Sequence, residues 1–164
     1  MGHRLRIQRL RGDRVIVLGI DPGLHGALAW VEDGRVIHVE DAPILAEGRQ
    51  KAIDAARLAA CIARHRADHA VIERVGARPT DAKASAFAFG RITGALEALV
   101  MATGLPLERV SPITWRRWAG IPAGASKDAS IAACLRLCPS SRPYLSRHDR
   151  ADAVLLALWR MRNA

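Results

Sequence analysis

A short apolar segment near the N-terminus constrains the fold more than any other part of the chain. Residues 14–20, RVIVLGI, are mostly β-branched and apolar, which is typical of a buried strand. This strand must end at Asp21, because Pro22 and Gly23 follow it and interrupt strand pairing. The carboxylate at the strand end has two explanations. Asp is common in turns, and ligand sites of α/β sheets lie beyond the carboxyl ends of their strands.

Strand and helix patterns alternate in the first half of the chain. Residues 26–41, GALAWVEDGRVIHVED, predict two short strands joined at Asp33-Gly34, a pair that suits a type I′ turn because both central residues need positive φ. Residues 50–66 predict a helix, and residues 69–74, HAVIER, predict a strand that ends at Glu73. The apolar face of that helix is expected at helical spacing, on Ile53, Ala56, Ala60 and Ala63.

The second half predicts one more strand and four helices. A long helix that Asp81 can cap is followed by a strand at 105–110 and a short helix at 111–120. Ser126 can cap a helix that runs to about Leu137, residues 139–143 form a loop, and the final helix begins near His148. The apolar stripe of the long helix is Phe89, Ile92, Leu96 and Leu99.

Gly90 and Gly94 lie on a neighbouring line of the long helix. Two small residues at this spacing permit close backbone approach, either to the sheet or to a second copy of the chain, and the sequence favours neither.

The order βββ-α-β-α-β, followed only by helices, predicts an α/β fold with a five-stranded mixed sheet and helices on both faces. At 164 residues the chain has the length of one domain. We therefore divide it into a basic arm, residues 1–14, and a single domain, residues 15–164.

Charge and composition narrow the class of partner. The net charge is +9, and a small domain this basic is typical of proteins that bind a polyanion, nucleic acid first. The alternative is that arginine and alanine content reflects the base composition of the genome. The 3 cysteines form no C-x-x-C pair, so we interpret them as reduced, buried thiols and expect no zinc site.

We expect no membrane span and a cytoplasmic protein. The longest apolar candidate, residues 92–107, is interrupted by Glu97 and Gly104 and is shorter than the roughly 20 residues that a span needs. The arginine-rich start of the chain lacks the hydrophobic core of a secretory signal.

Carboxylates from three segments are expected at one end of the sheet. Asp21 and Glu73 end two strands, and these meet if the strands are parallel neighbours. Asp149 and Asp152 are three apart at the start of the final helix and share a face with Leu156 and Trp159. Taken alone, these two aspartates also fit helix capping.

The set as a whole predicts a metal site. Carboxylates that converge repel one another unless a cation lies between them. Hard oxygen ligands favour Mg²⁺, with Mn²⁺ as a substitute. Two such ions about 4 Å apart can activate water and stabilise a leaving 3′ oxygen, which is an arrangement of nucleases.

The ordered motifs resemble the RuvC family of Holliday-junction resolvases, especially its phage-type members, in the ribonuclease H-like superfamily. The motifs span residues 15–159 and read GIDPG, VIERVG, FAFGRITGALEA, VSPITWRRWAG, SKDAS and HDRADAVLL. The resemblance implies a ribonuclease H-like fold and a crossover junction endodeoxyribonuclease. It also implies a homodimer, with the helix around Phe89 to Leu99 as the interface.

The resemblance also implies roles for single residues. Asp21, Glu73 and Asp152 match metal-binding carboxylates of the family, with Glu73 bridging two Mg²⁺ ions. Asp149 matches a further helix aspartate, although His148 is a rival because phage-type members often read H-G-R-A-D there. Lys127 resembles a lysine that contacts DNA near the scissile phosphate.

Further basic and aromatic residues near these motifs are candidates for DNA contact. Arg74 follows Glu73, and the WRRW segment places Arg116 and Arg117 between tryptophans that can stack on bases or lie in the core. His25 is treated as a loop residue that could reach substrate. Gly76 stands where bacterial members carry an aromatic residue, which puts base stacking at the junction in doubt.

Three other functions are alternatives to a junction resolvase. An actin-like ATPase needs two domains around its nucleotide, and GIPAGASK does not satisfy the phosphate-loop pattern. A related nuclease for flap DNA or an RNA/DNA hybrid would share the same fold and metal site. A DNA-binding module without activity would be expected to lack a carboxylate, whereas all four are present.

Overall fold

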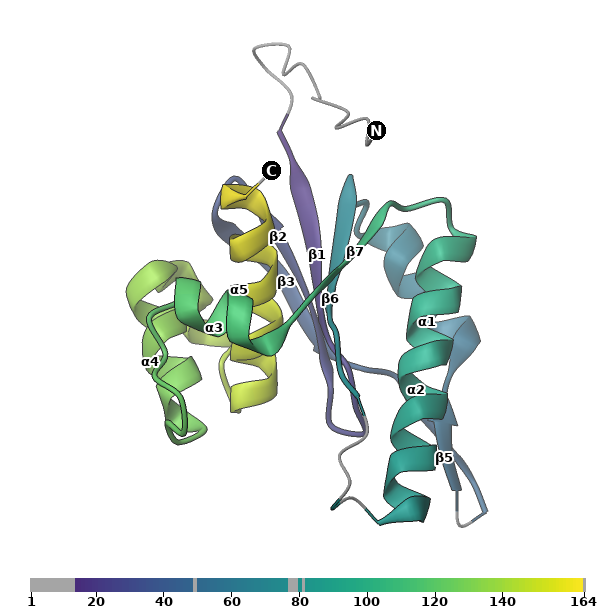
Figure 1. Ribbon diagram of the computed structural model, residues 1–164. Coiled ribbons are helices and arrows are strands. Elements are labelled where there is room, and N and C mark those ends of the chain that lie inside the picture. Colours follow the sequence, from purple (N-terminus) through teal and green to yellow (C-terminus); the bar gives the residue numbers. More distant parts are fainter. Residues whose placement is uncertain (1–13, 49, 77–79, 81, 164) are drawn as a thin grey trace, which may run out of the picture.

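The computed structural model describes residues 14–163 except 49, 77–79 and 81 (Figure 1). The predicted basic arm therefore lies outside the described residues apart from Arg14, which forms an ion pair with Glu32.

A five-stranded mixed sheet forms the centre of the fold, as predicted. Its order is β3-β2-β1-β6-β7. β1 pairs antiparallel with β2 and parallel with β6, so the sheet changes direction at its middle strand. The strands are β1 (Ile16–Asp21), β2 (Ala27–Glu32), β3 (Arg35–Asp41), β6 (His69–Glu73) and β7 (Leu107–Val110).

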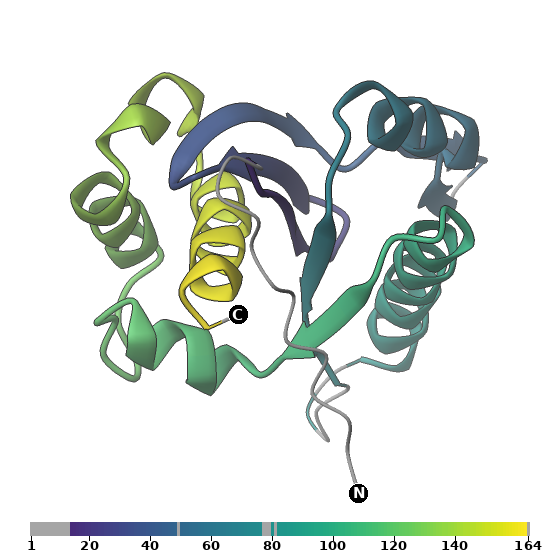
Figure 2. The same ribbon diagram turned by 90° about the horizontal axis from the view of Figure 1, so that it is seen from above.

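Helices cover both faces of the sheet (Figures 1 and 2). One face carries α1 (Ala55–Arg64) and α2 (Lys83–Ala102), and the other carries α3 (Pro112–Trp118), α4 (Asp128–Leu137), the 3₁₀ helix η1 (Pro139–Tyr144) and α5 (His148–Arg162). Strand alternation supplies both cores: Val17 packs on the α5 side, and its neighbour Leu18 packs on the side of α1 and α2.

The closest packing joins α5 to β1. Gly19 lies in the middle of β1, and a Cβ atom there would overlap the carbonyl oxygen of Ala153 and crowd the amide of Ala157. Only glycine allows α5 to approach the strand this closely. This contact fixes the start of α5 relative to the end of β1.

The Asp33-Gly34 turn is confirmed. Both residues have positive φ, 46° for Asp33 and 83° for Gly34, as a type I′ hairpin requires. The turn fixes the register of β2 against β3.

The segment before the first helix differs from the prediction. Gln50–Ile53 forms a strand, β5, that pairs with β4 (Ile44–Glu47), and α1 begins only after Asp54, whose Oδ1 accepts a hydrogen bond from the Arg57 amide at 3.0 Å. The predicted face was also wrong. The helix buries Leu58, Cys61 and Ile62 and exposes Ala56, Ala60 and Ala63, because larger side chains remove more apolar area from water than alanines do.

Ser126 and Asp81 are the caps predicted for two of the helices. Ser126 does not cap α4: Lys127 is the N-cap residue, the helix begins at Asp128, and Ser126 contributes only its carbonyl oxygen to the Ala129 amide. Asp81 lies outside the described residues, and α2 begins at Lys83 without a side-chain cap. The segment predicted as a loop, residues 139–143, lies in η1.

α2 has a buried apolar face and an exposed face that carries two glycines. Ile92, Leu96 and Val100 are buried, while Phe89 and Leu99 of the predicted stripe are only half-buried. Gly90 and Gly94 are exposed and a Cβ at either would meet nothing, so this line does not face the sheet. At 20 residues and a mean hydropathy of 1.2, α2 is long and apolar enough to cross a membrane by length and composition alone, and 17% of this window is buried in the structure.

Candidate functional site

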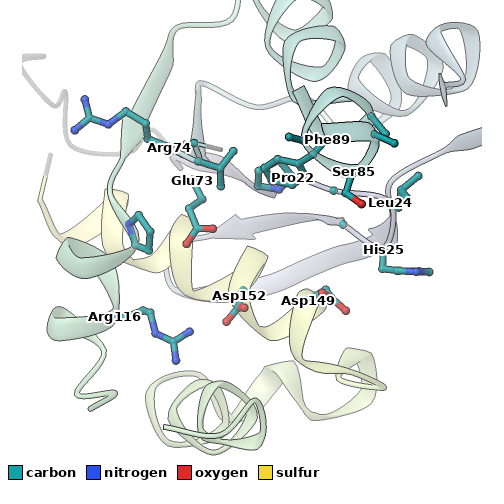
Figure 3. A pocket seen from close by; sticks show the side chains of 18 of the residues that line it. Pro22, Leu24, His25, Glu73, Arg74, Ser85, Phe89, Arg116, Asp149 and Asp152 are labelled. Atoms are coloured by element: carbon teal, nitrogen blue, oxygen red, sulfur yellow. The ribbon is translucent and has the colours of Figure 1, made fainter. Parts of the chain in front are cut away.

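Carboxylates from three elements meet at one edge of the sheet. Ile20 of β1 pairs with Ile72 of the parallel strand β6, so Asp21 and Glu73 end neighbouring strands side by side. The first turns of α5 lie at the same edge and add Asp149 and Asp152 (Figure 3). The structure thus brings together the four acidic residues that the sequence predicts as a set.

Three of these four residues border a pocket of about 1060 Å³, and the carboxyl group of Asp21 is buried beside them. Glu73, Asp149 and Asp152 line it together with the loop after β1, the loop after β6 and Phe89 of α2 (Figure 3).

Asp21 has the most strained electrostatic environment of the four. Burial raises its pKa well above the usual value, and the charges of Asp152, Glu73 and Asp149 raise it further. Arg147 opposes this effect only in part. The site therefore disfavours the ionised form unless a cation is added.

Glu73 is held by a tryptophan. The indole Nε1 of buried Trp115 donates a hydrogen bond to Glu73 Oε1 at 2.8 Å. Burial raises the pKa of Glu73, and this hydrogen bond opposes the rise. One carboxylate oxygen is thus fixed by α3, which orients the other toward the pocket.

Among the described residues, only one of the two carboxylate oxygens of Asp152 has a hydrogen-bond partner. The buried Ser130 side chain of α4 hydrogen-bonds to it, yet its Oδ1 is buried without a hydrogen-bond partner. Burial raises the pKa of Asp152, and Arg116 and His148 lower it. A buried carboxylate oxygen without a partner is a position where an ion or a proton is needed.

Asp149 and His148 form a pair at the helix start. His148 Nε2 lies 3.1 Å from Asp149 Oδ1, and Arg147 Nε lies 3.4 Å from Asp149 Oδ2. Asp149 lines the pocket, whereas His148 contacts Asp149 and is not one of the lining residues. Arg147 is the N-cap residue of α5, so neither aspartate caps the helix with its side chain.

This donor set fits a divalent cation. It consists of carboxylate oxygens, with raised pKa values on Asp21, Glu73 and Asp152 and an unpartnered oxygen on Asp152. Mg²⁺ and Mn²⁺ prefer such ligands. Asp21, Glu73, Asp149 and Asp152 are the residues that could hold them.

Two of the four residues predicted to contact DNA line the pocket, and the other two lie outside it. Arg74 and Arg116 line the pocket. Arg117 and Lys127 are exposed outside it, although Gly124, close to Lys127 in the sequence, is a lining residue. His25 also lines the pocket, and its carbonyl oxygen accepts a hydrogen bond from Arg147 at 2.8 Å.

Sequence reasoning missed the residues that support the carboxylates. Trp115 was interpreted as a stacking or core residue, Ser130 was not considered, and Arg147 was overlooked although it bridges α5 to the loop after β1. The contacts of Trp115 and Arg147 join residues 42 and 122 positions apart in the sequence, so no spacing pattern pointed to them.

Comparisons with known proteins identify the fold. The chain is similar to the Thermus thermophilus RuvC structure, with a TM-score of 0.62, 20% identity, and coverage of 88% of this chain and 92% of that one. It is similar to T. thermophilus RuvC in complex with a Holliday junction substrate, with a TM-score of 0.60, 19% identity, and coverage of 88% and 90%. It is also similar to the Fowlpox virus resolvase complexed with Holliday junction DNA, with a TM-score of 0.53, 14% identity, and coverage of 91% and 100%.

No family model and no curated protein matches the chain. At these identities the likeness shows the fold, which is the ribonuclease H-like fold of RuvC-type resolvases, as predicted.

Proposed function

We propose that this protein is a metal-dependent endonuclease that cuts branched DNA, with the four-way Holliday junction as its main substrate. The observation that supports this most strongly is the acidic cluster itself, in which three carboxyl groups have raised pKa values and Asp152 Oδ1 lacks a partner. These converging carboxylates repel one another even in a protein of net charge +9, and bound cations would remove that repulsion.

Asp21, Glu73, Asp149 and Asp152 would hold two Mg²⁺ ions, for which Mn²⁺ substitutes. When bound, the ions would activate the attacking water and stabilise the leaving 3′ oxygen, so that cleavage leaves 5′-phosphate ends. No covalent intermediate with the protein is required.

The other residues of the site position these ligands. Trp115 fixes one oxygen of Glu73, and Ser130 holds Asp152 from α4. Arg147 ties the start of α5 to the carbonyl oxygens of His25 and Gly26, which keeps Asp149 and Asp152 near the end of β1. Such supporting contacts preserve ligand geometry and typically affect activity about 10–100-fold.

The basic residues would bind the phosphate backbone. Arg74 and Arg116 line the pocket, where they would contact the phosphate to be cut, and the exposed Arg117 and Lys127 would contact phosphates farther along the strand. Such contacts are insensitive to sequence and weaken with salt.

The exposed side of α2 supports a homodimer. Phe87 is 67% exposed and Met101 is 48% exposed, and Gly90 and Gly94 between them allow close approach of a second helix. A two-fold dimer would present two sites to symmetric strands of a junction. The interface would then use this line of α2, because Phe89 lines the acidic pocket and Leu99 packs against the core.

A nuclease that cuts flap DNA or an RNA/DNA hybrid would use the same carboxylates. Only the substrate that is cleaved distinguishes these functions from junction resolution. The test compares cleavage of a four-way junction, a flap, a linear duplex and an RNA/DNA hybrid in Mg²⁺ by wild type and Asp21→Asn. We expect preferential junction cleavage by wild type and none by Asp21→Asn. Equal cleavage by Asp21→Asn would refute the metal site, whereas cleavage of the hybrid alone would refute the junction assignment and keep the site.

A further inference from the structure

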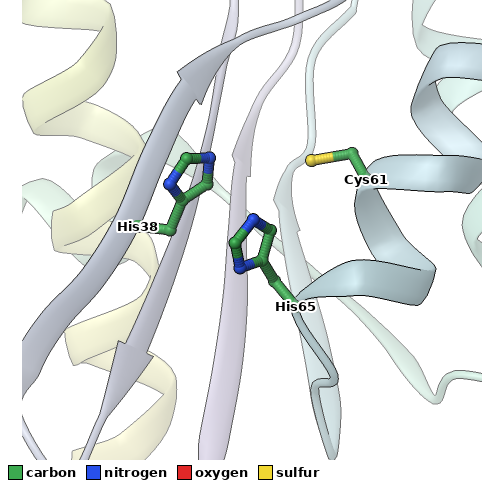
Figure 4. Close-up of side chains that lie close together, drawn as sticks. All are labelled: His38, Cys61 and His65. Carbon is green, nitrogen blue, oxygen red and sulfur yellow. The ribbon is translucent and has the colours of Figure 1, made fainter.

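A second cluster of metal-binding side chains lies on the sheet face opposite α5. His38 of β3, Cys61 of α1 and His65, the C-cap residue of α1, each place a ligand atom within 4.8 Å of the others (Figure 4). The cluster joins the edge strand of the sheet to the end of a helix and contains none of the residues of the acidic site.

The cluster is close to the geometry that coordination requires. The two imidazole rings stack with centroids 4.1 Å apart, and the Cys61 sulfur points from α1 toward them (Figure 4). A tetrahedral zinc ion with bonds of about 2.0–2.3 Å needs its ligand atoms about 3.5 Å apart. On binding, the three atoms would move about 1 Å closer, and the rings would turn out of their parallel stack so that a nitrogen lone pair of each points at the ion.

Glu40 lies beside the cluster but is not one of the residues whose ligand atoms all lie within 4.8 Å of one another. It is two residues from His38 on β3, and its Oε2 lies 3.4 Å from His38 Nε2. Two histidines and one cysteine supply three of the four ligands of a tetrahedral zinc site, and water or a rotated Glu40 would supply the fourth.

One observation points to a ligand at this cluster. His65 Nε2 is buried and has no hydrogen-bond partner among the described residues. A divalent ion would accept the lone pair of this nitrogen.

From these contacts we propose that His38, Cys61 and His65 bind a structural Zn²⁺ ion that fastens α1 to the edge strand β3. Sequence spacing does not reveal the site, since the ligands come from two distant segments and no C-x-x-C pair is present.

The test uses Co²⁺ as a spectroscopic substitute for Zn²⁺, titrated into metal-free protein with Mg²⁺ in excess to occupy the carboxylates. We expect one equivalent of Co²⁺ to produce a thiolate-to-metal charge-transfer band that Zn²⁺ abolishes. Trp30 reports the same event by fluorescence, because its ring centroid lies 5.3 Å from that of His65 and 5.6 Å from that of His38.

Variants assign the ligands. Cys61→Ser should abolish the band, and His65→Asn should weaken binding more than about 100-fold, since loss of a supporting contact alone costs about 10–100-fold. Cys134→Ser and Asp21→Asn are the controls and should retain it. Far-ultraviolet circular dichroism checks that each variant is folded, and His38→Asn, at a half-exposed position, serves if Cys61→Ser does not fold.

The proposal fails if wild type shows no thiolate band at millimolar Co²⁺, or if the band survives Cys61→Ser or disappears in Cys134→Ser. None of these outcomes depends on nuclease activity, so the zinc site and the proposed function can fail separately.

Discussion

Replacing Asp21 with Asn should stabilise the metal-free protein while abolishing its activity. In wild type, a buried carboxylate faces the charges of three others, and Asn has the same shape without the charge. An uncompensated buried polar or charged group costs about 1–3 kcal/mol or more. For a chain of this size about 1 kcal/mol shifts the Tm by about 2–4 °C, so we expect a rise of roughly 2–12 °C at pH 8.

The effect has a defined pH dependence. The pKa of Asp21 is raised in the folded state, so the folded protein binds this proton more tightly than the unfolded chain does. The penalty is absent below the unfolded pKa of about 3.9 and grows as pH rises toward the folded pKa. The Tm difference between Asp21→Asn and wild type should therefore be small near pH 4 and largest at pH 8.

The assay is thermal unfolding followed by circular dichroism in a chelating buffer at several pH values, then with Mg²⁺. Mg²⁺ should raise the Tm of wild type and raise that of Asp21→Asn much less. Asp33→Asn is the control, because Asp33 is an exposed turn residue and Asn also tolerates positive φ. The reasoning is refuted if Asp21→Asn lowers the metal-free Tm at pH 8, or if the difference does not change with pH.

Three further predictions concern the support of the site and the dimer. Trp115→Phe removes the hydrogen bond to Glu73 and should lower the rate of junction cleavage about 10–100-fold, whereas Trp118→Phe should not; equal rates in the two variants would contradict this role. Gly19→Ala should destabilise the protein by about 3 kcal/mol in urea unfolding, because its methyl group would overlap the backbone of α5, and a wild-type midpoint would show that the helix can move away. Gly94→Glu should convert dimers to monomers in light scattering while the far-ultraviolet circular dichroism spectrum stays that of the folded chain, and an unchanged mass would exclude this face of α2 as the interface.

Local sequence rules predicted the sheet and the acidic residues well, for identifiable reasons. An apolar run that ends at Asp21 and another that ends at Glu73 are short-range patterns, and parallel pairing then places the two carboxylates together. The Asp33-Gly34 turn follows from backbone geometry alone.

The parts that were missed depend on contacts distant in the sequence. The face that α1 buries is decided by what it packs against, and periodic alanines gave the wrong side. The hydrogen bond from Trp115 to Glu73 spans 42 residues, and no spacing rule reveals it. The His38–Cys61–His65 cluster likewise exists only once β3 and α1 are packed together.

Cleavage of a four-way junction labelled in turn on each of its strands tests the central claim most directly. With Mg²⁺ or Mn²⁺, wild type should make paired cuts at symmetric positions in two opposing strands and leave 5′-phosphate ends, and Asp152→Asn should make none. Cleavage that continues in excess chelator, or that is as strong in Asp152→Asn as in wild type, would contradict the account.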